Sequence, residues 1–377
     1  MTGARLALAE LRARPGRATL TSVGLALVLL LALSVTALAD GLVRGSTGVL
    51  RALDADVVVT DEAANHQLLR SRLVGAERTA LLMRPDVATA GQIGLVPTSA
   101  SVGGGAPERV TAVGFSPDAP AMPRDTVDGR LPRPGEPGSA AVDVALAGGD
   151  VVVGDTLSLA GEREVEVVGL VDDASFLQQP TVWLGQHDWA RLRQAVQRDA
   201  DYAEQLVGAT VLQSTEDPEA VATAITEEHD ELAVTTREGA VAAVPGVSAQ
   251  QVTLGAVVAV TLAVAVGLAA LIGVLQVLER RALLTALRAV GAPARTLLAS
   301  VAVRGVLLWV GALIVSTAVT VILAAAAPPS VPMEVRPVIV ASVGGISLVA
   351  ATLGVTAAAW PILSRLDPQD AVSEEPL

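Results

Sequence analysis

The side chains that most often do chemistry in proteins are scattered or missing in this chain. His66, His187 and His229 stand far apart, without HExxH or any other ligand spacing. No serine lies in a GxSxG context, the three glycines at 103–105 lack the helix start that a phosphate site needs, and the acidic residues are dispersed. We therefore expect solvent-exposed histidines, no catalytic residue, no metal site and no bound cofactor.

Two residue types are absent altogether, and their absence excludes whole classes of site. Without Cys there are no disulfides and no thiolate metal ligands. Without Lys there is no Walker A lysine to bind nucleotide phosphates, so this polypeptide is not itself a P-loop ATPase. If ATP hydrolysis drives this protein, another subunit must carry it out.

Charge is segregated along the chain. Residues 40–250 hold 15 Arg against 32 acids, whereas residues 1–17 hold four Arg against one Glu and residues 279–304 hold five Arg against one Glu. The two basic segments flank apolar runs in a chain of mean hydropathy +0.54, and such segments are typical of cytoplasmic loops. The acidic part would repel phosphates, so we expect no nucleic acid as a partner.

These runs predict a multi-pass protein of the bacterial cell membrane with both termini in the cytoplasm. The fold class expected is four transmembrane α-helices plus a large α/β (α+β) extracytoplasmic domain between helices 1 and 2. The expected order is a cytoplasmic amphipathic helix (1–17), transmembrane helix 1 (18–40), the extracytoplasmic domain (41–250), transmembrane helix 2 (252–278), a cytoplasmic loop (279–304), transmembrane helix 3 (305–327), transmembrane helix 4 (338–363) and a cytoplasmic tail (364–377). The spans carry no charge, which argues against an ion-coupled carrier.

Two alternatives concern the N-terminus. The first apolar run could be a cleaved signal peptide, because Ala37-Leu38-Ala39 fits a cleavage pattern; the run is longer than the usual apolar region of a signal peptide, which favours an uncleaved span. Residues 3–14 have helical periodicity and are expected to end at Pro15-Gly16. They form either a helix in the membrane interface or a basic leader that orients the first span.

The extracytoplasmic domain is expected to mix strands and helices. Strands are predicted at 56–60, 92–96, 109–115, 156–159, 164–171, 181–184, 209–213 and 232–236, and helices at 76–83, 188–198 and 218–229. The terminal pieces, 41–98 and 206–240, are expected to pack together, with the middle of the domain as an inserted lobe.

One candidate packing surface lies on the second span. Its small residues recur every four positions, a spacing that lets another helix approach closely. They are Gly255, Ala259, Ala263 and Gly267. Either another span or a second protomer could pack there, although an Ala-rich helix also produces such a stripe by composition.

The basic loop 279–304 is the candidate coupling surface. Residues 280–290 can form a helix, Gly291 is a natural stop and Pro293 a natural restart. The apolar stripe of that helix would contain Leu283, Leu284, Leu287 and Val290. A helix–turn–helix between two spans can transmit a push from a cytoplasmic partner. In the alternative, the arginines only satisfy the positive-inside rule and the stripe packs against lipid headgroups.

Four stretches resemble the FtsX-like permeases of ABC transporters with a MacB-type periplasmic core. They are ADVVVT (55–60), GRLPRPGEPGSAAVDVALA continuing to VGDTLSLAGEREVEVVGLVDD (129–173), ERRALLTALRAVGAPARTLLAS (279–300) and LDPQDAV (366–372). The chain departs from the pattern at Leu283 or Leu284, where family members often carry an acid. That departure puts one ionic contact to an ATPase in doubt.

The resemblance implies a permease without catalysis of its own. It would form a homodimer or a heterodimer with a second permease, surrounded by membrane lipid, and would bind a cytoplasmic ABC ATPase subunit. The ATPase-coupling residues would be Glu279, Arg280, Arg281, Leu287, Arg288, Gly291 and Ala292. The work would drive export of a substrate or mechanotransmission to an extracytoplasmic partner. The alternatives are a membrane sensor or regulator of a cell-wall enzyme, and a membrane-anchored enzyme.

Overall fold

The computed structural model describes residues 15–73, 75–161, 163–197, 208–279, 284–286, 290–291, 293–328 and 331–364. The chain divides into two compact units. The helical unit comprises Met1–Gly41 and Val252–Leu377, and the sheet unit comprises Leu42–Gln251. The predicted helix at 3–14 and the tail beyond 364 lie outside the described residues.

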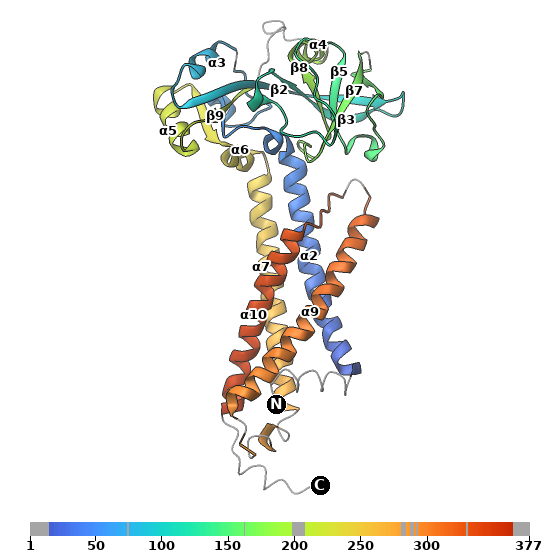
Figure 1. Cartoon of the computed structure of the whole chain (residues 1–377), viewed down its shortest axis with the longest axis vertical. Coiled ribbons are helices and arrows are strands. Elements are labelled where there is room, and N and C mark those ends of the chain that lie inside the picture. Colours follow the sequence, from blue (N-terminus) through green and yellow to red (C-terminus); the bar gives the residue numbers. More distant parts are fainter. Residues whose placement is uncertain are drawn as a thin grey trace. The chain divides into compact units, whose positions relative to one another are not determined.

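Four long helices confirm the four predicted spans. They are α2 (Pro15–Ala52), α7 (Val247–Leu278), α9 (Ala294–Ala326) and α10 (Pro337–Ser364) (Figure 1). Each contains an apolar stretch long enough to cross a bilayer. The helices extend beyond the predicted spans because backbone hydrogen bonding does not stop where the apolar run stops.

Two helix starts lie at or directly after a proline. Pro15 and Gly16 are the first helical residues of α2 that the structure describes, and the end of the helix predicted at 3–14 stays a prediction. Proline fits the first turn of a helix, where its missing N–H needs no partner. Helix α9 begins at Ala294, directly after the predicted restart at Pro293, and the span predicted from 305 lies within it; Arg304 is therefore a helical residue, and only 8% of it is exposed.

The helical unit has its own apolar core, to which all four helices contribute. Its buried residues are Leu25, Ala26, Leu29, Ala265, Ala269, Leu308, Trp309, Ala312, Ala351 and Val355. Glycines allow close helix contacts there: a Cβ on Gly273 would lie 2.8 Å from Val355 Cγ1, and one on Gly344 would lie 2.7 Å from Leu313 Cδ2. The outward faces carry exposed Val, Leu and Ile, as expected of helices surrounded by lipid.

The sheet unit is built on one mixed, ten-stranded sheet. Its order is β10-β1-β9-β2-β3-β8-β5-β7-β4, with β6 paired to β2 and β7. The strands are β1 (Val57–Asp61), β2 (Val87–Val102), β3 (Glu108–Phe115), β4 (Asp128–Gly129), β5 (Ser139–Asp143), β6 (Thr156–Leu159), β7 (Arg163–Val171), β8 (Thr181–Gly185), β9 (Ala209–Ser214) and β10 (Leu232–Thr236). The helices are α3 (Gly75–Leu82), α4 (Gln186–Val196), α5 (Pro218–Glu228) and α6 (Arg237–Ala243).

Strand β1 lies between β9 and β10 and runs antiparallel to both. The two terminal pieces of the domain therefore share one end of the sheet, as expected. The middle of the domain is not a separate sheet, because the 16-residue β2 pairs with β9 near its start and with β3 and β6 farther along. Two strands, β4 and β5, and one helix, α6, were not predicted.

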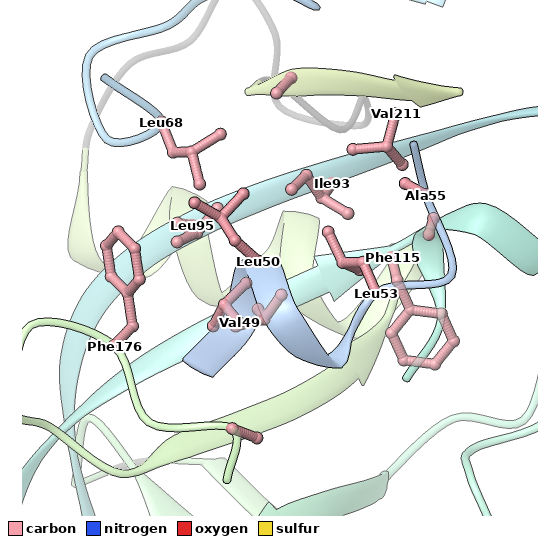
Figure 2. Close-up of a cluster of buried hydrophobic side chains, with 14 of the residues drawn as sticks. Val49, Leu50, Leu53, Ala55, Leu68, Ile93, Leu95, Phe115, Phe176 and Val211 are labelled. Carbon is pink, nitrogen blue, oxygen red and sulfur yellow. The ribbon is translucent and has the colours of Figure 1, made fainter. Parts of the chain in front are cut away.

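The last turns of α2 belong to the core of the sheet unit. Val49, Leu50 and Leu53 are completely buried. Figure 2 shows these three side chains among Ile93, Leu95, Phe115, Phe176 and Val211, which come from the strands and from the loop after β7. This helix end is therefore an internal element of the domain rather than a linker.

Candidate functional site

The predicted coupling residues lie between α7 and α9, and the structure describes some of them. The Glu279 N–H donates to the Leu275 carbonyl at 2.9 Å and continues the last turn of α7. Residues 284–286 are helical, and Gly291 has φ +98°, a left-handed conformation that suits a helix stop. Pro293 directly precedes α9. Arg280, Arg281, Leu287, Arg288 and Ala292 lie outside the described residues, as does Leu283.

Leu284 anchors this segment to the helical unit. Its side chain is 5% exposed and clusters with Val277 of α7, Leu297 of α9 and Ala359 of α10. Val290, expected on the same apolar stripe, is 88% exposed. Its N–H donates to the Ala286 carbonyl at 3.1 Å, and it directly precedes the left-handed Gly291. Leu284 therefore joins the segment to α7, α9 and α10.

The small-residue stripe on α7 does not pack against any other described part of the chain. Gly255, Ala259, Ala263 and Gly267 are exposed, and a Cβ built on either glycine meets no atom within 4 Å. The small residues that face the core of the helical unit are instead Ala265, Ala269 and Gly273. That second four-residue spacing was available in the sequence. Packing of the exposed stripe against a second protomer stays a prediction.

A second site, missed by sequence reasoning, surrounds the last turns of α2. Residues 172–180, here called the strap, follow β7 and lie across the helix. Asp173 accepts from the guanidinium groups of both Arg44 and Arg51, and the two Arg51 contacts measure 2.7 and 2.6 Å. Charge-assisted, bidentate pairs of this kind are the stronger class of hydrogen bond. The strap is therefore held to two successive turns of the same helix face.

Backbone contacts join the strap to the same turns. The Gln178 N–H donates to the Gly45 carbonyl at 2.8 Å, and Gln178 Nε2 donates to the Leu42 carbonyl at 2.6 Å. A Cβ on Gly48 would lie 2.5 Å from the Ser175 carbonyl oxygen, so only glycine fits. The strap contains three non-glycine residues at positive φ, which are Asp173, Leu177 and Gln178. Left-handed backbone at such residues persists only where surrounding contacts hold it.

A buried carboxylate supports the strap from the sheet. Asp143, at the end of β5, accepts from Ser175 Oγ and from the Ala145 N–H at 2.9 Å. Burial raises the pKa of Asp143, the hydrogen bond from Ser175 opposes that rise, and the nearby Asp172 and Asp173 charges add to it. One sequence signal could have revealed this contact between the strap and α2. Arg44 and Arg51 are spaced so that both cations lie on one helix face, with Gly48 between them.

The histidines do not form a site in the described part of the chain. His187 is exposed, as expected, whereas His66 and His229 are half-buried. His229 Nδ1 lies 3.3 Å from Glu231. No group of three or more His, Asp or Glu with metal-binding geometry occurs among the described residues.

Comparisons with known proteins agree with this architecture. A family model for the MacB-like periplasmic core domain matches residues 18–228. The comparison with curated proteins finds no match. Among solved structures, the periplasmic region of MacB from Actinobacillus actinomycetemcomitans is 10% identical, with 50% of this chain and 92% of that chain covered and a TM-score of 0.35.

The extracellular domain of the noncanonic ABC-type transporter YknZ from Gram-positive bacteria is also 10% identical, with 48% of this chain and 98% of that chain covered and a TM-score of 0.34. At these scores the two structures add nothing to the family match, which spans more than half of the chain. The match includes the first candidate membrane helix, and three more follow it; this chain belongs to the ABC-transporter permease family that carries a MacB-like periplasmic core domain.

Proposed function

We propose that this chain is the permease subunit of a bacterial ABC transporter of the FtsX/MacB type, which couples ATP hydrolysis by a separate subunit to substrate export or mechanotransmission outside the membrane. The family match over residues 18–228 carries the proposal. The four apolar helices and the absence of Lys support it, because a membrane subunit without a Walker lysine needs an ATPase partner.

The charge pattern supplies the orientation in this proposal. Both termini and residues 279–304 face the cytoplasm, and the acidic sheet unit lies outside the cell membrane. The ATPase binds the segment that includes Glu279 and Gly291, and Leu284 passes its movement to α7, α9 and α10. The exposed α7 stripe packs against a second permease, identical or homologous, and the remaining apolar faces contact lipid.

The route to the sheet unit is helix α2. Residues 15–52 form one uninterrupted helix whose last turns lie in the sheet core under the strap. A helix is stiff along its axis, so displacement of its first turns reaches the strap without a flexible linker. Asp173 and Gly48 are the residues that hold this connection.

Co-purification from the native membrane tests the class of protein. The full chain is extracted in a mild detergent, captured through a tag, and its partners are identified and quantified. We expect a stoichiometric P-loop ATPase. Recovery of an extracytoplasmic hydrolase without any ATPase would contradict the proposal and would support a sensor or regulator of a cell-wall enzyme.

Two substitutions then test the coupling segment. Arg288→Glu reverses a charge in the predicted docking helix, and Gly291→Pro cannot adopt φ +98°. We expect both to uncouple ATP hydrolysis from function while membrane insertion is unchanged, with Arg70→Glu on the exposed surface of the sheet unit as the control. Normal coupling in the reconstituted complex of both variants would refute the role of this segment.

A further inference from the structure

The sheet unit contains a cavity of about 330 Å³ that the proposed function does not use. Its lining includes Phe115, Pro132, Arg133, Pro134, Gly185 and His187. A volume of this size is within the range of small-molecule sites. Phe115, the last residue of β3, is in the lining, and its side chain also belongs to the apolar core around the end of α2.

The position of the cavity in the sheet is one that binding sites favour. Strands β3 and β8 are parallel neighbours, and their last residues, Phe115 and Gly185, are Cα partners. Helix α4 starts directly after β8. In α/β sheets, ligands bind beyond the carboxyl ends of parallel strands, where strand ends and helix starts meet. The helix is fixed there, because Trp189 packs against Gly94 and its Nε1 donates to the Ala112 carbonyl at 3.3 Å.

The opposite wall is a proline-rich loop, 132–137, that is held in place before any ligand arrives. Arg130 makes two contacts with Glu136, at 2.8 and 2.7 Å, and the same carboxylate accepts from the Arg133 N–H at 3.1 Å. The Gly138 N–H donates to Asp188 Oδ2 at 2.7 Å, which joins the loop to α4. Prolines at 132, 134 and 137 further limit the loop's conformations. Pre-organised walls reduce the entropic cost of binding.

The lining of the cavity contains one arginine, Arg133, and two carboxylates, Glu136 and Asp188. The acids in its lining are already engaged, Glu136 by Arg130 and Asp188 by the Gly138 N–H and by Arg163 at 3.5 Å. The Arg133 guanidinium is exposed and donates no hydrogen bond within the described part of the chain. Residues 40–250 carry a large excess of acids, so an exposed guanidinium that makes no hydrogen bond with either carboxylate of the lining is a local exception. It favours an anionic group attached to an apolar body.

We propose that this cavity binds a small ligand that carries an oxyanion, either a carboxylate or a phosphate, on a compact apolar group. Arg133 binds the oxyanion, and Phe115 with the proline wall covers the apolar part. Binding needs no ATPase, so this inference stands or falls independently of the proposed function.

Calorimetric titration of the full chain in detergent tests the proposal. The probes are N-acetyl-L-leucine, N-acetyl-L-leucinamide, which has the same body without the charge, and inorganic phosphate. We expect the carboxylate to bind at least about tenfold more tightly than the amide, because a charge-assisted hydrogen bond is lost in the amide. Binding of inorganic phosphate would assign the site to phosphate-bearing ligands, and binding of the carboxylate alone would assign it to carboxylates.

Three variants separate this site from binding elsewhere. Arg133→Gln is expected to weaken oxyanion binding by about tenfold, and Arg70→Gln, at an exposed position outside the lining, is the control. Gly185→Leu keeps the charge and fills the cavity, since a Cβ there meets no atom within 4 Å; it should abolish binding of N-acetyl-L-leucine. Absence of binding by both anions, or equal binding by the two arginine variants, would overturn the proposal.

Discussion

The substitution Gly48→Ala has two opposite effects where the strap crosses α2: it raises helix propensity, and it disturbs the packing of the strap on the helix. Alanine in place of a mid-helix glycine stabilises a helix by about 1 kcal/mol. Here the new Cβ would lie 2.5 Å from the Ser175 carbonyl oxygen and 2.6 Å from the Asp173 carbonyl oxygen. Both are backbone atoms, so the strap itself must move.

The magnitude follows from the contacts that this movement breaks. Overpacking costs about 1 to 3 kcal/mol. Loss of the hydrogen bonds from the Leu177 and Gln178 N–H groups to α2 carbonyls costs about 1 kcal/mol each. After the gain in propensity is subtracted, these contributions sum to about 2 to 4 kcal/mol; the lower value already makes opening of the strap about thirtyfold more favourable.

Hydrogen–deuterium exchange of the full chain in detergent measures this quantity directly. Peptides that cover residues 172–180 should exchange about thirtyfold faster in Gly48→Ala than in the wild type. Gly24→Ala, in the same helix, is the matched control, because a Cβ there meets no atom within 4 Å. If the two variants give the same exchange in the strap, the close packing of Gly48 does not restrain it, and the reasoning is wrong.

Three further predictions concern carboxylates of the sheet unit. Asp173→Asn keeps a residue type that tolerates positive φ but removes the negative charge that pairs with Arg44 and Arg51. Hydrogen–deuterium exchange in residues 172–180 should become about tenfold faster. In the control variant, Asp172→Asn, it should be unchanged. Hydrogen bonding from Arg130 lowers the pKa of Glu136 to about 2, so its pairing is complete above pH 4.5 and is lost as pH falls through about 2; carboxyl NMR should show that midpoint, and Arg130→Gln should move it upward. Burial raises the pKa of Asp143, so its charge disfavours the fold at neutral pH; wild type should gain stability relative to Asp143→Asn in chemical denaturation as pH falls through the raised pKa, and a pH-independent difference would contradict this.

Most of the secondary structure was predictable because it depends on local patterns. The strand predicted at 56–60 is rich in β-branched residues and forms β1, and the capped segment from Pro218 forms α5. Strand β5 was missed because its sequence, SAAVD, has little strand propensity of its own. It is extended because β7 and β8 supply hydrogen-bond partners on either side.

The candidate sites also differ in whether local sequence could predict them. The segment between α7 and α9 was predicted because a basic run between two apolar runs can be recognised in the sequence alone. The strap was missed because Asp173 and its partners Arg44 and Arg51 are separated by more than a hundred residues. The choice of α7 stripe also needed the structure, because two sets of small residues have the same four-residue spacing and only one faces the core.

The sequence by itself determined the membrane spans, the charge asymmetry that predicts their orientation, the absence of a P-loop lysine and the family resemblance. These properties depend on the hydropathy, charge and residue types of short segments of the chain. Partitioning between lipid and water depends on the same local quantities and not on the detailed fold. Only the tertiary structure decided that α2 ends inside the sheet core, that Gly48 is the one residue type that fits beneath the strap, and that Arg133 faces a cavity at the ends of β3 and β8. Those features depend on which distant backbone atoms come within a few ångströms, and the folded sheet sets these distances.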